Sequence, residues 1–297
     1  MLIGVIADDF TGATDIAGFL VSEGLRTVQL GGVPTSPLLL DVDAAVVSLK
    51  SRSCPVPDAI AQSVAALRWL KDQGAQQIFF KYCSTFDSTA QGNIGPVTDA
   101  LMAELGTPIT VITPSLPING RDVFNGNLFV LGVPLNESGM RNHPVNPMTD
   151  ANLMRLMERQ ATGRCGLINW QCVEQGSAAV RTALEQAQAA GFAYVVTDAF
   201  RETHLHVLGE ALRDLPLVTG GSGLGAGLAR AWACERGLVA KEARQAAMPV
   251  AGPAVVLSGS CSEMTNRQVA HYRELAPSLA LSVEACLTRP DHYVDEL

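Results

Sequence analysis

The sequence predicts an α/β fold with a mainly parallel sheet flanked by helices, and three observations support this prediction. Short apolar runs alternate along the chain with longer segments of helical periodicity, which is the pattern of repeated βα units. The short runs are continuously apolar, as expected of strands that are buried on both faces. The stretches that follow them are rich in Asp, Ser, Thr, Arg and Gly, and active groups collect at the carboxyl ends of parallel strands.

The individual elements follow from run length and periodicity. Eight runs have strand character: 2–7, 27–30, 44–49, 77–81, 109–113, 166–169, 194–198 and 217–219. Six segments have helical periodicity: 14–23, 58–73, 95–105, 150–160, 177–190 and 203–212. The irregular stretch 114–147 carries apolar patches, which predict an ordered insertion.

With 297 residues, the chain is longer than one typical domain, so we expect two. Residues 1–238 form the first domain in this prediction. Residues 239–253 form an Ala-, Lys- and Pro-containing linker, and a strand at 254–257 opens the second domain, 254–297.

Composition excludes several classes of protein. The net charge of −8 argues against nucleic-acid binding, because no basic face can dominate. Seven scattered cysteines without a CxxC pair indicate a reducing compartment. The start of the chain lacks the form of a signal peptide, and the longest apolar stretch, 246–262, is interrupted by proline and glycine. We therefore expect a cytoplasmic protein with no membrane partner.

The first candidate site is the stretch 7–15, which we expect to be a loop that carries Asp8, Asp9, Thr11 and Asp15. An Asp before a helix can simply cap it. Capping explains one aspartate but not three, and adjacent carboxylates are tolerated mainly where a base, a hydroxyl or a metal requires them. We favour the functional interpretation, with the choice of base between Asp8 and Asp9 open.

Further polar groups follow other predicted strands. Lys81 at a strand end is a natural clamp for a carboxylate or phosphate, although an ordinary turn with a solvated lysine explains the segment equally well. Arg52 could supply a second cation. Taken alone, Arg52 and His143 are more often surface or structural residues.

Two small-residue turns complete the candidates. Gly221, Ser222 and Gly223 lie in a glycine-rich turn that approaches a dinucleotide fingerprint, but no strand ending in an acidic residue follows it, so an NAD-dependent dehydrogenase is a weak alternative. Ser258, Gly259 and Ser260 could hold nucleotide phosphates. The sequence contains no P-loop, GxSxG or HExxH motif and no metal-ligand spacing.

Together these motifs resemble the four-carbon acid sugar kinase family, and most closely its 3-oxo-tetronate 4-kinase branch. The matching elements, in the family's order, are ADDFTGATD (7–15), KSRS (50–53), KYCSTFDST (81–89), GNIGPV (92–97), His143-Pro144 and TGGSGL (219–224).

The resemblance implies a kinase that uses ATP with Mg²⁺ to phosphorylate the terminal hydroxyl of a four-carbon acid, in an active site between an N-terminal substrate domain and a C-terminal nucleotide domain. It implies that the second domain is incomplete here, which raises the alternative of a non-catalytic sugar-acid binding module. No protein metal ligand is identified, and the helices leave room for a homodimer. The implied roles are catalysis for Asp8 and Asp9, nucleotide binding for Ser258, Gly259 and Ser260, and substrate binding for Thr11, Asp15, Arg52, Lys81, Asp87, Ser88, Thr89, His143, Gly221, Ser222 and Gly223.

Overall fold

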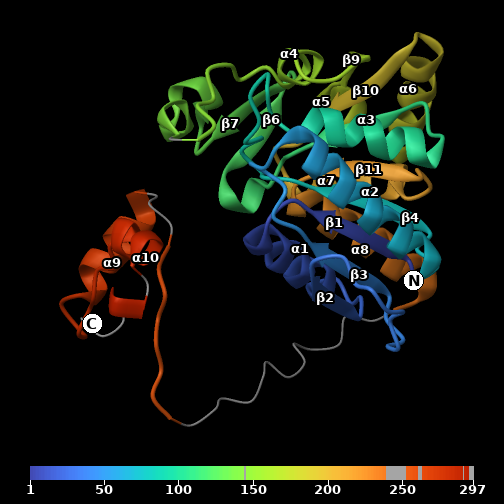
Figure 1. Cartoon of the computed structure of the whole chain (residues 1–297). Helices are drawn as coiled ribbons and strands as arrows, with labels where there is room; N and C mark the ends of the chain where they lie inside the picture. Colours follow the sequence, from blue (N-terminus) through green and yellow to red (C-terminus); the bar gives the residue numbers. More distant parts are fainter. Residues whose placement is uncertain (144, 239–251, 260–262, 290, 294–297) are drawn as a thin grey trace. The chain divides into compact units, whose positions relative to one another are not determined.

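The computed structural model describes residues 1–143, 145–238, 252–259, 263–289 and 291–293 (Figure 1). The chain divides into two compact units, Met1–Arg244 and Gln245–Leu297.

The first unit is built on an eight-stranded parallel sheet, as predicted. The strand order is β2-β3-β1-β4-β11-β5-β10-β9, so β1 and β4 lie side by side near its middle. All eight predicted strands are present, most with shifted ends: β1 (Ile3–Ala7), β2 (Thr27–Gly31), β3 (Ala44–Ser48), β4 (Gln77–Lys81), β5 (Thr110–Thr113), β9 (Arg164–Ile168), β10 (Phe192–Thr197) and β11 (Leu217–Gly220).

Helices cover both faces of the sheet (Figure 1). One hydrophobic cluster joins the sheet to α1 (Phe10–Ser22), α6 (Ser177–Ala189), α7 (Glu202–Leu212) and α8 (Ser222–Arg236). A second cluster, on the other face, includes side chains of α2 (Val56–Asp72), α3 (Ile94–Leu105) and α4 (Leu153–Glu158). The short helix α5 (Trp170–Glu174) and the first turns of α8 were not predicted, because short length and frequent glycine both weaken a helical pattern.

The described residues of the insertion, 114–143 and 145–147, are ordered, as predicted. It contains a three-stranded antiparallel sheet of β6 (Arg121–Phe124), β7 (Asn127–Val130) and β8 (Val133–Pro134), with short helices at Pro117–Asn119, Leu135–Glu137 and Gly139–Asn142. The buried carboxylate of Asp198, after β10, accepts hydrogen bonds from the backbone amides of Asn125 and Gly126 at 2.9 Å. These bonds attach the β6–β7 turn to the main sheet.

The second unit contains α9 (Glu263–Tyr272) and α10 (Val283–Thr288). The predicted strand at 254–257 is wrong, because residues 253–259 form neither helix nor strand. A strand needs a hydrogen-bonded neighbour, and residues 253–259 take part in none of the described strand pairings. Most of the predicted linker lies outside the described residues, and the domain boundaries stay predictions. None of the helices described is long and apolar enough to cross a membrane.

Candidate active site at the carboxyl ends of the central strands

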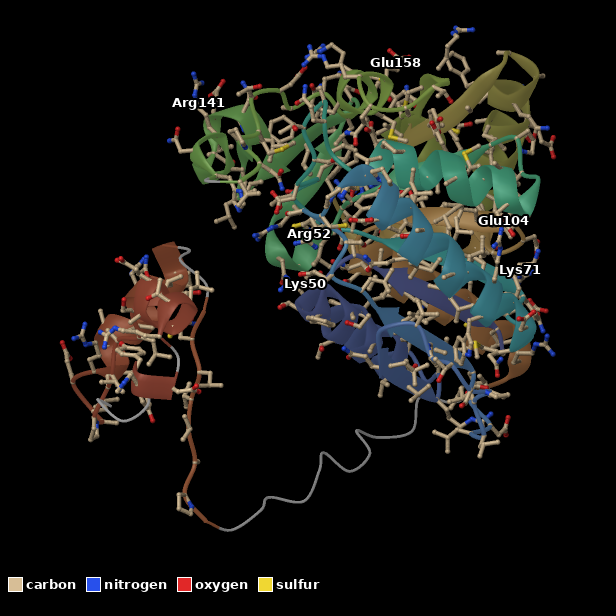
Figure 2. The ribbon with its side chains drawn as sticks, viewed as in Figure 1. Lys50, Arg52, Lys71, Glu104, Arg141 and Glu158 are labelled. Carbon is tan, nitrogen blue, oxygen red and sulfur yellow. The ribbon has the colours of Figure 1, made fainter. Side chains whose placement is uncertain are left out.

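The parallel register brings four polar segments to one edge of the sheet. Ala7 at the end of β1 pairs with Ser48 of β3 and with Lys81 of β4, and Lys81 also pairs with Gly220 of β11. Asp8, the Arg52 loop, Lys81 and the start of α8 therefore follow neighbouring strands at the same level. In Figure 2, Arg52 lies at this end of the sheet, whereas Lys71 and Glu104 lie toward the opposite end.

Arg52 holds two carboxylates. Its Nε and Nη2 donate to the two oxygens of Asp8 at 2.9 and 2.8 Å, and Nη2 also lies 2.8 Å from Oδ1 of Asp9. The side chain of Asp8 is 5% exposed and that of Arg52 20%. Burial alone would lower the pKa of Arg52. The hydrogen bonds that Arg52 donates to Asp8, together with the nearby negative charges, outweigh this effect, so the pKa of Arg52 is raised. The Arg52 charge is thus largely neutralised by the protein itself.

Asp9 caps α1, which corrects the expectation of a long opening loop. Its Oδ1 accepts the Gly12 amide at 2.9 Å, so the helix begins at Phe10 and the loop shrinks to Asp8 and Asp9. Thr11 and Asp15 consequently lie on α1, both exposed, and Asp15 accepts a hydrogen bond from the Ser222 hydroxyl. Helix capping, the simpler of the two interpretations, therefore accounts for the position of Asp9. The hydrogen bonds from Arg52 account for that of Asp8.

Lys81 is a buried cation that lacks a carboxylate partner within 4.0 Å in the described part of the chain. The residue is 3% exposed, and its Nζ donates to the Tyr82 carbonyl oxygen at 2.7 Å. A Cβ on Gly12 would lie 2.3 Å from Oδ1 of Asp9 and 2.8 Å from Nζ, so the glycine in α1 makes room for both charged groups. A buried ammonium without a salt bridge favours an anionic ligand.

Asp87 extends the acidic cluster. Its Oδ2 lies 4.0 Å from Nη1 of Arg52, and its buried Oδ1 has no hydrogen-bond partner among the described residues. Burial raises the pKa of Asp87. The charges of His143 and Arg52 oppose this increase, whereas those of Asp8 and Asp9 add to it. His143 therefore lies within electrostatic range of Asp87, and its Nδ1 accepts the Asn146 amide at 3.0 Å.

A cavity of about 10 Å³ lies between Asp8, Arg52, Asp87 and Asn93. That volume corresponds to roughly one water molecule, so a four-carbon acid does not fit inside it.

Two residues that were predicted to bind substrate form hydrogen bonds with other residues of the protein. Ser88 is 1% exposed and donates to Gln160 Oε1 at 2.7 Å. Thr89 is half-buried, 3.4 Å from Gln91 Oε1. The structure also places Asn93 at the site, a residue that sequence reasoning quoted in a motif but gave no role. The available signal was an asparagine two residues before the helix predicted at 95–105.

The glycines at the start of α8 are explained by close packing. A Cβ would lie 2.5 Å from the Pro114 carbonyl oxygen at Gly221 and 2.5 Å from that of Ser115 at Gly223. These contacts account for the near match to a dinucleotide fingerprint. The first amides of α8 still lack intrahelical acceptors and lie after the strand that pairs with Lys81.

The predicted nucleotide residues belong to the second unit. Ser258 and Gly259 are exposed, and Ser260 lies outside the described residues. Their role stays a prediction. No group of three or more His, Cys, Asp or Glu side chains in the described ranges is arranged to hold a metal ion.

A parallel α/β sheet whose carboxyl edge gathers a carboxylate cluster and a buried lysine is typical of a domain that binds a small polar ligand. The model of the sugar-binding N-terminal domain family matches residues 3–228, and that of the nucleotide-binding C-terminal domain matches residues 255–297. The chain belongs to this family of acid sugar kinases, which confirms the resemblance.

Two curated relatives share the name 3-oxo-tetronate kinase. The chain is 63% identical over 286 residues to the 3-oxo-tetronate kinase of Escherichia coli K12, covering 96% of this chain and 73% of that protein. It is 59% identical to the 3-oxo-tetronate kinase of Brucella melitensis biotype 1, covering all of this chain and 68% of that protein.

Solved structures support the fold. A crystal structure of a Haemophilus influenzae protein superposes with a TM-score of 0.80 at 56% identity, covering 99% of this chain and 70% of that one. A Bordetella bronchiseptica protein, described as a domain-swapped dimer with bound citrate, superposes with a TM-score of 0.67 at 25% identity, covering 99% and 70%.

Proposed function

We propose that this protein is an ATP-dependent kinase that phosphorylates the 4-hydroxyl of 3-oxo-tetronate. The observation that carries the proposal is the buried Lys81, which forms no salt bridge with the described residues, beside a carboxylate cluster at the strand edge where such folds bind ligands. The substrate is taken from the names of the two curated relatives described above, which are 63% and 59% identical to this chain.

Lys81, rather than Arg52, is our choice for the group that binds the substrate carboxylate. Arg52 already has two carboxylates at 2.8–2.9 Å, so a third anion would gain little from it. Lys81 has no such partner in the described structure, and the first amides of α8 follow the neighbouring strand. Citrate in the Bordetella relative is consistent with a carboxylate site in this family.

Asp9 is our choice for the base that accepts the proton of the substrate hydroxyl. Both oxygens of Asp8 are bonded to Arg52, which leaves that carboxylate little capacity to take a proton. Asp9 is 28% exposed, and only its Oδ1 is engaged by Gly12 and Arg52 among the contacts of the described residues. Phosphoryl transfer needs little beyond such a base, positioning and charge neutralisation.

The nucleotide is ATP in this proposal, consistent with the match to a nucleotide-binding domain. The described side chains include no group of three or more His, Cys, Asp or Glu arranged to hold a metal ion. Mg²⁺, which accompanies ATP in phosphoryl transfer, would be held mainly by the nucleotide phosphates.

A coupled ADP-release assay against tetronates and 3-oxo-tetronates tests the proposal. We expect turnover with a 3-oxo-tetronate and much less with the reduced acids. Absence of ADP release with every acid would refute the kinase activity. Thermal shifts separate the alternatives, because a binding module is stabilised by the acid but not by ATP, whereas a dehydrogenase responds to NADH.

We also propose a homodimer, because the Bordetella relative is described as a dimer. Light scattering at several protein concentrations tests this, and a mass of one chain at all of them would contradict it.

A further inference from the structure

Asn93 directly precedes α3 but does not cap it. An asparagine in this position ordinarily accepts a hydrogen bond from the first turn of the helix. The backbone of Asn93 is instead helical (φ −95°, ψ −13°), and its side chain makes no capping bond. Two other side chains accept hydrogen bonds from the first turn of α3 instead. Gln160 Oε1 accepts the Gly95 amide at 3.0 Å, and Ser88 Oγ accepts the Ile94 amide at 3.4 Å.

The side chain of Asn93 is committed to the loop that carries Arg52. Its Nδ2 lies 2.7 Å from the carbonyl oxygen of Ser51, 3.2 Å from that of Arg52 and 2.9 Å from that of Cys54. Asn93 is 7% exposed, so these bonds form in a largely dry environment. On the other side of the loop, the amides of Ser51 and Arg52 donate to the carbonyl oxygen of Asp8 at 2.9 and 3.1 Å.

These contacts form a connected path to the acidic cluster. Asn93 fixes the backbone of Arg52, and the Arg52 guanidinium holds Asp8 and Asp9. A residue that forgoes its usual local bond is expected where function requires a different one. We infer that Asn93 is a positioning residue for phosphoryl transfer, which acts through Arg52 on the carboxylate that takes the substrate proton.

This inference rests on the proposed kinase function, and a double-mutant cycle tests it in the full chain. We expect Asn93→Ala to lower kcat about 10-fold or more, because small displacements of a catalytic group are costly. The KM for ATP should stay unchanged. In an Arg52→Ala background, the same substitution should lower kcat little further, because the Arg52 side chain through which Asn93 acts is absent. Losses that simply multiply would overturn the inference.

A control separates positioning from stability. Thr98 is fully buried one turn further along α3 and donates to the Ile94 carbonyl oxygen at 2.7 Å, away from the Arg52 loop. We expect Thr98→Ala to lower the melting temperature about as much as Asn93→Ala while kcat stays within about twofold. An equal loss of kcat in both variants would mean that Asn93 is merely structural.

A spectroscopic readout does not depend on kinase activity. With arginine labelled by ¹⁵N, the bonded Nε–H of Arg52 should give a resonance that Arg52→Lys removes and that Asn93→Ala shifts or broadens. Asn93→Ser, which can still donate one bond, should give an intermediate result if Asn93→Ala folds poorly. An unchanged Arg52 resonance in the Asn93 variants overturns the inference, whereas lack of turnover in the unsubstituted protein overturns only the proposed function.

Discussion

At the scale of single residues, Asp9 performs two tasks that one substitution can separate. Asparagine caps helices about as well as aspartate, but it cannot accept a proton. We expect Asp9→Asn to lower kcat by about 10²-fold or more, with a melting temperature close to that of the unsubstituted protein. Steady-state kinetics and calorimetry measure the two effects.

Asp9→Ala is the matched control, because alanine loses the cap as well. It should lose activity and, in addition, about 1 kcal/mol of stability. Near-normal turnover of Asp9→Asn would show that Asp9 is not the base.

Asp87 is predicted to make stability depend on pH. Burial raises its pKa, so ionising this carboxyl costs the folded state more than the unfolded one. The penalty is absent below the ordinary carboxyl pKa and grows as the pH rises through the raised value. We expect Asp87→Asn to raise the melting temperature at pH 7, by roughly 2–4 °C for each kcal/mol gained, and to change it little near pH 4.

Thermal unfolding at both pH values tests this prediction. If Asp87→Asn instead lowered the melting temperature at pH 7, the attraction of Asp87 to His143 and Arg52 would outweigh the cost of burying its charge. Because Asp87 faces the proposed site, activity should fall even as stability rises.

The sequence predicted that several of these polar residues lie near one another, because parallel strands bring their carboxyl ends together. Asp8, Arg52 and Lys81 each follow a recognisable strand, so their proximity follows from fold class alone. The sequence could not show which side chains form ion pairs or hydrogen bonds with one another. Whether a carboxylate faces Arg52 or Lys81 depends on tertiary distances, and the use of the Asn93 side chain on a distant loop has no local signal.

At the scale of elements, the packing of α7 on α8 depends on two glycines. A Cβ on Gly209 would lie 2.1 Å from the backbone of Gly227, and one on Gly227 would lie 2.1 Å from the Leu205 carbonyl oxygen. We expect Gly209→Ala to separate the helices and to lower the free energy of unfolding by about 2 kcal/mol or more. Chemical denaturation measures the loss.

Gly18→Ala is the control within a helix. Gly18 is exposed in α1, and nothing lies within 4 Å of its would-be Cβ. Alanine there should stabilise the protein by up to about 1 kcal/mol through helix propensity alone. Similar effects of the two substitutions would refute the role of close helix contact.

These glycines also mark the limit of prediction for elements. Buried strands have a strong apolar signal, and all eight were found. The start of α8 was read as a turn because four glycines within seven residues oppose a helix locally. Contacts with the 114–115 backbone, α1 and α7 override that preference, and such contacts are invisible before the chain is folded.

At the scale of the whole molecule, the hydrophobic core described belongs almost entirely to the first unit. Of the buried apolar side chains among the described residues, only Ala285 lies in the second unit, where Val255, Leu257 and Leu287 are more than 70% exposed. Apolar burial is the main source of folding free energy. Residues 1–244 should therefore fold alone, with the melting temperature of the 297-residue chain and with the same affinity for the sugar acid.

Calorimetry and acid titrations on fragment 1–244 and on the 297-residue chain test this expectation, with fragment 245–297 examined by circular dichroism. The shorter fragment should show little cooperative unfolding, because so little apolar surface is buried in its described part. If removal of residues 245–297 lowered the melting temperature by more than about 5 °C, the two units would stabilise one another. Loss of acid binding alone, without loss of stability, would instead mean that the second unit contributes directly to the acid site.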